Sequence, residues 1–338
     1  MTFARLWRPR RYRRCATVAV AIALLAASVT VAAADLDPTS YRRLETAQKA
    51  LADGAFEDAL ATLQPLLDSP RSALARAIAH QLAAEAAIAL DRPEAALGHL
   101  NEALAAGALE PAQSRFVEAR IGYLELAAGR FEAASAHLAR AIDPARPDPA
   151  LTALAALAEA RAGRCEDALD RLSLGSAPPA ADARTWFEVK ALCQVELGRL
   201  TAASESLKAL LALAPSDPNY WRQLVAVLQR AERYEDASAA YGAAREIVPL
   251  DGVDLVNFSR LLVYIGRPLE GAEVLAAGLA DGRVPETAEH LTALADAYLL
   301  AREAAKAYPA LERRAALGNA NANANANANA NANANANA

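Results

Sequence analysis

The sequence predicts an all-α fold in which short helices pack in pairs along a solenoid. Three observations carry this prediction: a turn phrase that recurs every 34 to 38 residues, side chains of fixed size at fixed distances from that phrase, and an alanine-rich composition. The chain has 338 residues, of which 91 are alanine and only 5% are aromatic. Methyl groups suit thin layers of closely packed helices better than the deep core of a β-sandwich.

The recurring phrase marks the turn between the two helices of each unit. It reads GAFEDA at 54–59, GRFEAA at 129–134, GRCEDA at 163–168, GRLTAA at 198–203 and ERYEDA at 232–237. Weaker copies begin at Asp91, Gly266 and Arg302. The small residue that closes each phrase falls at 59, 96, 134, 168, 203, 237, 271 and 307. Five of the eight units have glycine at the turn, where the end of a helix needs a positive φ.

Side chains at fixed offsets from the closing residue predict how the two helices pack. Four residues after it the side chain is large and apolar, as a buried position on the second helix requires. These residues are Leu63, Leu100, Leu138, Leu172, Leu207, Tyr241, Leu275 and Leu311. Twelve residues before it the side chain is nearly always small, which lets the two helices approach closely. These residues are Ala47, Ala84, Gly122, Ala156, Ala191, Val225, Ser259 and Ala295.

A period of 34 with this signature is that of the tetratricopeptide repeat, a helix–turn–helix unit. The chain resembles this family from the start of the first repeat to residue 318. The resemblance implies a right-handed superhelical α-solenoid of about eight repeats over residues 35–318. Pro70, Pro215, Pro249 and Pro285 should end second helices, because proline cannot continue the hydrogen-bond ladder. A turn-rich stretch predicts a bend near 175–182.

Residues 1–34 have the pattern of an export signal. Six arginines precede an apolar run from Ala16 to Val31, which is followed by three alanines and then Asp35. This order predicts a secretory signal peptide that is cleaved after Ala34, leaving a periplasmic protein. The alternative is an uncleaved anchor that holds the protein at the inner membrane, facing the periplasm. The 20 residues from Cys15 to Ala34 are long enough to span a bilayer.

The charge of the remaining chain excludes two classes of partner. Without the six arginines before Asp35, the chain has 40 acidic and 29 basic residues, a net charge of −11. Nucleic acid and anionic membrane surfaces both require clustered positive charge, so neither is expected to bind. The tail, Asn319–Ala338, is ten copies of Asn-Ala and is predicted to be disordered, because it has no large apolar groups to bury.

The sequence contains no motif of a catalytic, cofactor or metal site: HExxH, CxxC, GxSxG and glycine-rich phosphate loops do not occur in it. The four histidines are His80, His99, His137 and His290. His99 and His137 have the same offset in neighbouring repeats, where they are expected to be solvated and too far apart to share a metal. The sequence therefore favours a non-enzymatic binding protein over an enzyme.

Two cysteines, Cys165 and Cys193, follow the predicted signal peptide. Cys165 begins the second helix of the fourth repeat, and Cys193 lies in the first helix of the fifth repeat, which should pack against it. An even number of cysteines in an exported protein is typical of a disulfide. The alternative is a pair of buried free thiols.

The last three repeats resemble a more specific group of proteins. The resemblance rests on these segments: PSDPNYWRQL at 215–224, YEDA at 234–237, DLVN at 254–257, GRP at 266–268, AEVL at 272–275, GLADG at 278–282, LTALADAY at 291–298 and ARE at 301–303. They are similar to tetratricopeptide proteins that accompany TonB-type energy-transduction systems in Gram-negative bacteria. Gly271 and Leu269 depart from that pattern, in which alanine and an aromatic residue are expected. The resemblance implies a periplasmic partner of the TonB–ExbB–ExbD machinery.

A binding groove is expected along the first helices of the last three repeats, since solenoids of this kind bind extended or helical peptides there. The residues predicted to face the groove are Arg222, Gln229, Asn257, Arg260, Tyr264, Thr292 and Asp296. Arg222 and Arg260 are the expected contacts for carboxylates of a partner. Changing both to Glu should leave the helices intact. The sequence thus predicts an exported scaffold or adaptor for protein–protein interactions in the cell envelope. The alternative is a periplasmic assembly or holdase-like factor that binds unfolded envelope proteins.

Overall fold

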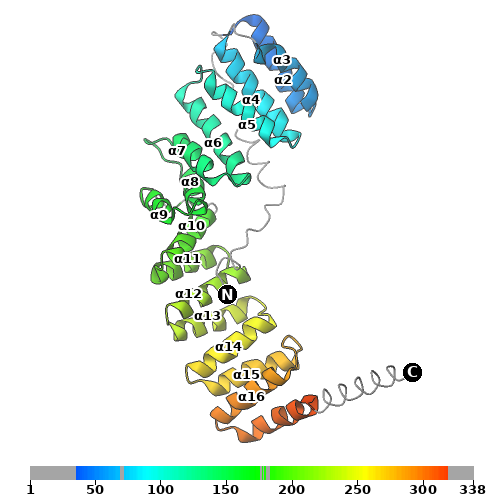
Figure 1. Cartoon of the computed structure of the whole chain (residues 1–338), viewed down its shortest axis with the longest axis vertical. Coiled ribbons are helices and arrows are strands. Elements are labelled where there is room, and N and C mark those ends of the chain that lie inside the picture. Colours follow the sequence, from blue (N-terminus) through cyan, green and yellow to red (C-terminus); the bar gives the residue numbers. More distant parts are fainter. Residues whose placement is uncertain (1–35, 69–71, 176, 178, 180–182, 319–338) are drawn as a thin grey trace, which may run out of the picture. The chain divides into compact units, whose positions relative to one another are not determined.

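The computed structural model describes residues 36–68, 72–175, 177, 179 and 183–318. In this part of the chain the regular structure is helical and contains no strand (Figure 1). The chain divides into two compact units, the first ending at Leu197 and the second beginning at Gly198. This boundary lies between the two helices of the fifth predicted repeat. The bend predicted near 175–182 falls largely on residues outside the described ranges.

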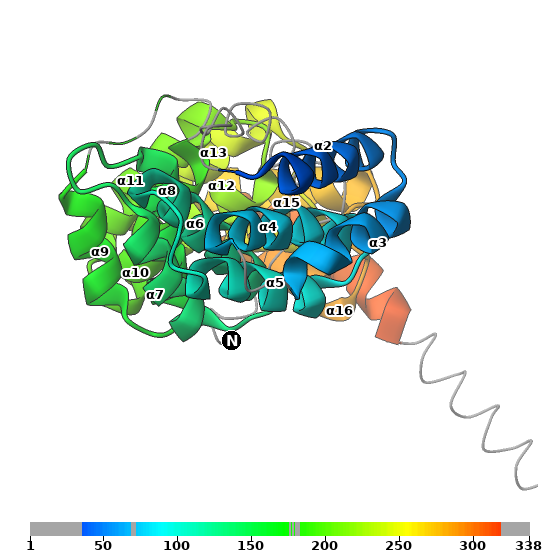
Figure 2. The same cartoon turned by 90° about the horizontal axis from the view of Figure 1, so that it is seen from above.

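The first unit contains four complete helix pairs and one further helix in its described residues (Figures 1 and 2). The pairs are α2 (Pro38–Ala52) with α3 (Phe56–Leu67), α4 (Ala73–Ala89) with α5 (Pro93–Ala105), α6 (Pro111–Ala127) with α7 (Phe131–Ala141), and α8 (Pro149–Arg161) with α9 (Cys165–Ser173). Helix α10 (Ala183–Glu196) packs against both α8 and α9.

The second unit begins with α11 (Leu200–Leu213) and continues with helix pairs. These are α12 (Pro218–Arg230) with α13 (Tyr234–Ile247), α14 (Gly252–Tyr264) with α15 (Pro268–Ala280), and α16 (Ala288–Leu300) with a last helix whose described residues are 304–318. Each numbered helix of this unit packs against the next one along the chain. The eight predicted turns are therefore all present, at the predicted positions.

All eight turn residues have a left-handed backbone, including the three that are not glycine. Gly54, Gly129, Gly163, Gly198 and Gly266 have φ between 71° and 81°. Asp91, Glu232 and Arg302 occupy the equivalent positions in the other repeats, with φ of 57°, 59° and 61°. Glycine adopts this conformation without the steric conflict that a Cβ introduces. The turn geometry thus belongs to the repeat, whichever residue stands there.

The packing of small against large residues confirms the predicted register. A Cβ on Gly122 of α6 would lie only 2.5 Å from Cγ of Leu138 on α7. The small positions of all eight repeats are buried, and seven of the eight large positions are buried as well. The exception is Leu311, which is 37% exposed because it lies on the last described helix and no further repeat follows within the described residues. The prediction that Leu311 is buried is wrong for this reason.

The residues at the helix ends explain where several of the helices begin and end. The first helices α2, α8 and α12 each start with proline directly after an aspartate whose carboxylate accepts backbone N–H groups: Asp37, Asp148 and Asp217. Helices α11 and α13 end two residues before Pro215 and Pro249, as predicted. Helix α15 ends at Ala280, before left-handed Gly282, so Pro285 is not what terminates it. Pro70 lies outside the described residues.

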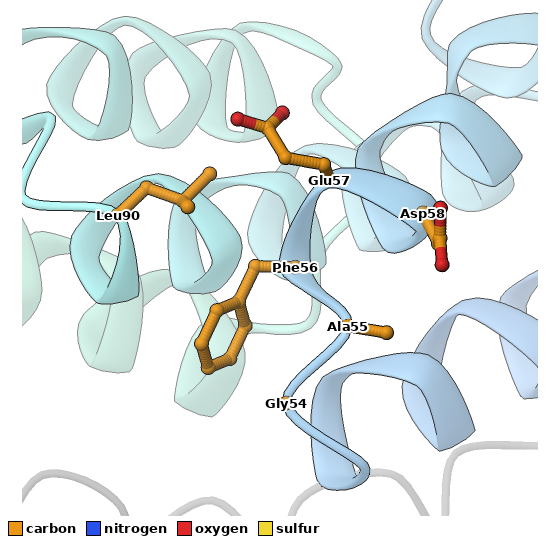
Figure 3. Close-up of a pocket in the computed structure, with 6 residues that line it drawn as sticks. All are labelled: Gly54, Ala55, Phe56, Glu57, Asp58 and Leu90. Atoms are coloured by element: carbon orange, nitrogen blue, oxygen red, sulfur yellow. The ribbon is translucent and has the colours of Figure 1, made fainter.

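Consecutive turns of the first unit are joined by ion pairs. Glu57 accepts a hydrogen bond from Arg92 of the next repeat at 2.7 Å, and Glu94 accepts one from Arg130 at 2.9 Å. Glu132 and Arg164 form the third pair of this ladder. Figure 3 shows the first turn, with Glu57 at the start of α3 and Leu90 at the end of α4 beside a shallow hollow. In the second unit, Arg233 and Arg267 instead bind acids three residues along their own turns.

Candidate functional site

The residues predicted to line a groove lie on the first helices of the second unit. Arg222 and Gln229 are on α12; Asn257, Arg260 and Tyr264 are on α14; Thr292 and Asp296 are on α16. Asn257, Arg260, Tyr264 and Asp296 are exposed, whereas the other three are half-buried. The structure therefore leaves four of the seven side chains open to solvent.

Arg222 is engaged inside the unit. Its guanidinium donates from Nε to Asp254 Oδ2 at 2.9 Å and from Nη2 to Asp251 Oδ2 at 2.8 Å. Asp254 is buried, and Asp251 also caps α14 by accepting the backbone N–H of Asp254 at 2.9 Å. These bonds raise the pKa of Arg222. Arg222 thus fastens α12 to the start of α14, and a carboxylate from a partner would have to displace these bonds.

The same cluster includes Tyr241 of α13. The pKa of Tyr241 is raised to about 12, mainly by burial and next by the negative charge of Asp254. Changing Arg222 to Glu would place a third carboxylate beside Asp251 and Asp254, and repulsion between like charges opposes folding. These bonds contradict the premise of the expected double reversal, that both arginines face the groove and take no part in the contacts between repeats; its effect on the helices stays a prediction.

Arg260 is the accessible arginine of the predicted pair. Its Nη2 donates to Glu289 Oε1 of α16 at 2.6 Å, and the two side chains are 55% and 73% exposed. Surface ion pairs of this kind contribute little to stability, so a ligand can exchange with either partner. The hydroxyl of Thr292 donates to the carbonyl of Ala288 in its own helix, which leaves it a weaker candidate for a partner contact.

Three large apolar side chains on the same first helices are exposed. They are Tyr264 on α14 and Leu299 and Leu300 on α16, with exposed fractions of 69%, 48% and 64%. Tyr264 and Leu300 both stand seven residues before the closing residues of their repeats, so they occupy equivalent positions on adjacent first helices. We call these three residues the exposed strip. Leu299 and Leu300 were not predicted as site residues, although the offset that Leu300 shares with Tyr264 is visible in the sequence.

An aromatic contact orients one end of the strip. The rings of Tyr234 and Tyr264 meet edge to face, with centroids 4.8 Å apart. A hydrogen bond between their hydroxyls raises the pKa of Tyr234. Tyr234 begins α13 two residues after the left-handed Glu232, so the turn of the sixth repeat supports the ring of Tyr264 while leaving most of it exposed.

A separate apolar hollow of about 320 Å³ lies among α11, α12 and α13. Trp221, Leu224 and Leu228 of α12 line it together with Leu211 of α11 and small residues of α13. The charged side chains at the hollow, Lys208 and Asp236, are each paired within their own helix or turn, to Glu205 and Arg233. The hollow contains no unpaired charge that would select a ligand.

The histidines are not the solvated residues that the sequence predicted. His80 of α4 is buried, and its Nδ1 lies 3.1 Å from Nδ1 of half-buried His99 on α5. His137 of α7 is only 18% exposed, and its Nδ1 lies 2.6 Å from Glu118 Oε2 on α6. The prediction is wrong for His99 and His137 because each faces a partner on the first helix of its own repeat. His290 is half-buried, and its Nδ1 lies 2.7 Å from the carbonyl oxygen of Pro285.

Both cysteines are buried free thiols that hydrogen bond to each other between α9 and α10. Burial raises the pKa of both thiols, which disfavours the reactive thiolate. The helices thus bring Cys165 and Cys193 together as predicted, and their disulfide stays a prediction. In the described ranges, no group of three or more His, Cys, Asp or Glu side chains could hold a metal ion. None of the helices searched there is long and apolar enough to cross a membrane.

Comparison with known proteins gives structural likeness only. No protein-family model matches the chain, and no curated protein matches its sequence. A tetratricopeptide repeat protein from Parabacteroides merdae is 11% identical over 76% of this chain and 98% of that one, with a TM-score of 0.46. The C-terminal part of such a protein from Cytophaga hutchinsonii is 13% identical over 81% and 95%, also at 0.46. YrrB, described as a tetratricopeptide protein with an unusual peptide-binding site, is 16% identical over 51% and 86%, at 0.44.

The period, the eight left-handed turns and the small-against-large packing within the chain itself show the repeat type. The chain has the fold of a tetratricopeptide-repeat protein.

Proposed function

We propose that the chain is a non-enzymatic scaffold for protein–protein interactions in the cell envelope, and that a partner segment binds across α14 and α16. The exposed strip is the observation that carries this proposal. Large apolar side chains that gather on one surface mark interaction sites more often than isolated ones do. The neighbouring Arg260–Glu289 pair and Asp296 supply exposed charges of both signs beside it.

This arrangement suits an extended or helical segment that places two apolar side chains against adjacent repeats. Tyr264 offers a large amphipathic surface, and such residues are frequent anchors of binding energy. Arg260 and Glu289 can pair with charged groups on the flanks of that segment. Arg222, held by Asp251 and Asp254, acts as structural support and not as the contact.

Three variants test the site. Tyr264→Glu and Leu300→Glu place charge on the exposed strip, and Ile247→Glu is the matched control, because Ile247 is 49% exposed on α13 of the same unit. We expect the strip variants to reduce recovery of the partner in crosslinking pull-downs by about tenfold or more, as the loss of a central anchor does. The control should retain recovery. If Ile247→Glu lost the partner and the strip variants kept it, the site would lie on the second helices.

The identity of the crosslinked protein tests the pathway. A TonB, ExbB or ExbD component would support the role that the last three repeats suggest by resemblance. A different envelope protein would support the scaffold and contradict the TonB association. Loss of the signal by competition with any unfolded apolar polypeptide would favour the holdase-like alternative, since a scaffold discriminates among partners.

The cellular location rests on residues 1–34. We expect N-terminal sequencing of the native protein to begin at Asp35 in a soluble periplasmic fraction, because the arginine-rich, apolar and alanine segments follow the order of a cleaved signal. Recovery of residues 1–34 in the membrane pellet would instead establish the anchored form.

A further inference from the structure

His80 and His99, the two histidines of the second repeat, are in contact through their Nδ1 atoms. Only one of these two nitrogens can carry hydrogen while the contact is a hydrogen bond. Their Nδ1 atoms are 3.1 Å apart, whereas their ring centroids are 5.4 Å apart. The centroids are farther apart than the nitrogens by 2.3 Å, so each Nδ1 points toward the other ring. One Nδ1–H therefore donates to the unprotonated Nδ1 of its partner.

We propose that the His80–His99 pair is a pH-responsive clasp between α4 and α5, closed when at least one imidazole is neutral and opened when both are protonated. When both rings are neutral, or when one of them carries an additional proton, one Nδ1 donates and the other accepts. With two, both nitrogens carry hydrogen, the hydrogen bond is lost, and two positive charges face each other beside a buried ring. His99, the more exposed of the two, must then turn toward solvent.

The surroundings favour the neutral form. Burial lowers the pKa of His80, and the neighbouring His99 lowers it further. Burial also lowers the pKa of His99. The charged groups that face His80 are Glu102 of α5, Arg76 of α4 and Asp68 at the end of α3, and Glu102 also faces His99. The two acids oppose the lowering and Arg76 adds to it, so the direction is set mainly by burial and by the second ring.

The third repeat has a contact between the same two positions, but an acid stands where the second repeat has His80. His80 and Glu118 both stand sixteen residues before the closing residues of their repeats, and His99 and His137 both stand three residues after them. In the third repeat the histidine therefore meets a carboxylate, with its Nδ1 2.6 Å from Glu118 Oε2 and 2.7 Å from Nη2 of Arg140. The chain itself thus supplies the substitution that should reverse the response.

The sign of the pH effect follows from linkage. Because the folded protein holds both rings neutral more strongly than the unfolded chain does, the clasp stabilises the fold fully above about pH 6.5, the value of a free histidine. This stabilisation is lost as the pH falls below that value and through the lowered pKa values of the two histidines in the folded protein. In His80→Glu, His99 gains a carboxylate partner, so its contribution is present at low pH and lost as the pH rises.

The experiment is an NMR titration of the histidine C2–H signals in the full chain, assigned with His80→Gln and His99→Gln. We expect the His80 and His99 signals to shift at lower pH than those of a blocked histidine in the same buffer. In His80→Glu the His99 signal should shift at higher pH. The proposal would be overturned if both wild-type signals shifted at the same pH as the signal of the blocked histidine. It would also be overturned if His80→Glu left the pH at which the His99 signal shifts unchanged.

Thermal unfolding gives a second readout. Between pH 7.5 and 5.5, wild-type protein should lose about 3 °C more in midpoint than His99→Gln, in which the second charge cannot form. His80→Glu should lose less than His99→Gln. Glu85 of α4, whose pKa is raised by burial, is present in all three proteins, so its effect cancels in the comparison. Equal losses in the three proteins would show that the clasp does not open over this range.

Discussion

Individual residues at the eight turns show how a repeat tolerates variation. The left-handed position accepts glycine without strain, whereas Asp91, Glu232 and Arg302 adopt it with a side chain. A Cβ on Gly266 would meet no atom within 4 Å, so the backbone conformation alone penalises a substitution there. Glu232 and Gly266 are therefore matched probes of the same geometry within one unit.

We expect Glu232→Gly to raise the free energy of unfolding of the second unit by about 0.5–1 kcal/mol, because glycine removes the strain of a positive φ. Gly266→Ala should lower it by about 1 kcal/mol for the converse reason. Chemical denaturation measures both changes. A gain in the free energy of unfolding for Glu232→Gly and a similar loss for Gly266→Ala would confirm that the backbone of the turn, and not a side-chain contact, sets the difference. Destabilisation by Glu232→Gly would contradict it.

Arg222 and Arg260 look alike in the sequence and differ in the fold. Arg222→Ala would leave the carboxylate of Asp254, which is 7% exposed, without its guanidinium partner. We expect a loss of about 2–3 kcal/mol in the free energy of unfolding, as for a buried charged group left unpaired. Arg260→Ala should change it by no more than about 0.5 kcal/mol, because its ion pair is exposed. Similar losses in the two variants, measured in urea, would show that the Arg222 cluster is no more than a surface ion pair.

Helices of the array depend on neighbours, and the end of the array shows this dependence directly. Leu207 on α11 and Leu311 on the last described helix have the same offset, but Leu207 is 1% exposed and Leu311 is 37% exposed. Leu207→Ala should destabilise the second unit by about 2–4 kcal/mol through the cavity it leaves. Leu311→Ala should cost less than about 1 kcal/mol, since water already reaches the site. Thermal melts of the two variants compare them, and an unmoved midpoint for Leu207→Ala would mean that the register is wrong.

The helices could be predicted from sequence because each repeat imposes its offsets independently of the others. Gly122 and Leu138 meet as their positions require, and the turns fall where the phrase recurs. The site was less predictable. The partners of Arg222 lie 29 and 32 residues away in the next repeat, and no local pattern joins them. Leu299 and Leu300 resemble core residues in a helical pattern, but no element among the described residues covers them.

At the scale of the whole molecule, the division between Leu197 and Gly198 raises the question of how many cooperative units the chain contains. In arrays of repeats, stability is a sum of terms within repeats and between neighbours, so a weak link can separate two transitions. The tryptophans suit this question. Apart from Trp7 in the predicted signal segment, there is one in each unit: Trp186 on α10 and Trp221 on α12.

With Trp7 and Trp221 changed to Phe, fluorescence reports the first unit; with Trp7 and Trp186 changed, it reports the second. We expect Leu138→Ala, a fully buried position on α7, to lower the denaturant midpoint seen by Trp186 and to leave that of Trp221 in place. Leu207→Ala should do the reverse. If either substitution shifted both midpoints equally, the chain would unfold as one cooperative array. Separate shifts would mean that the two units unfold independently. A partner bound on α14 and α16 would then stabilise only the second unit by mass action, and the histidine clasp would make only the stability of the first unit depend on pH.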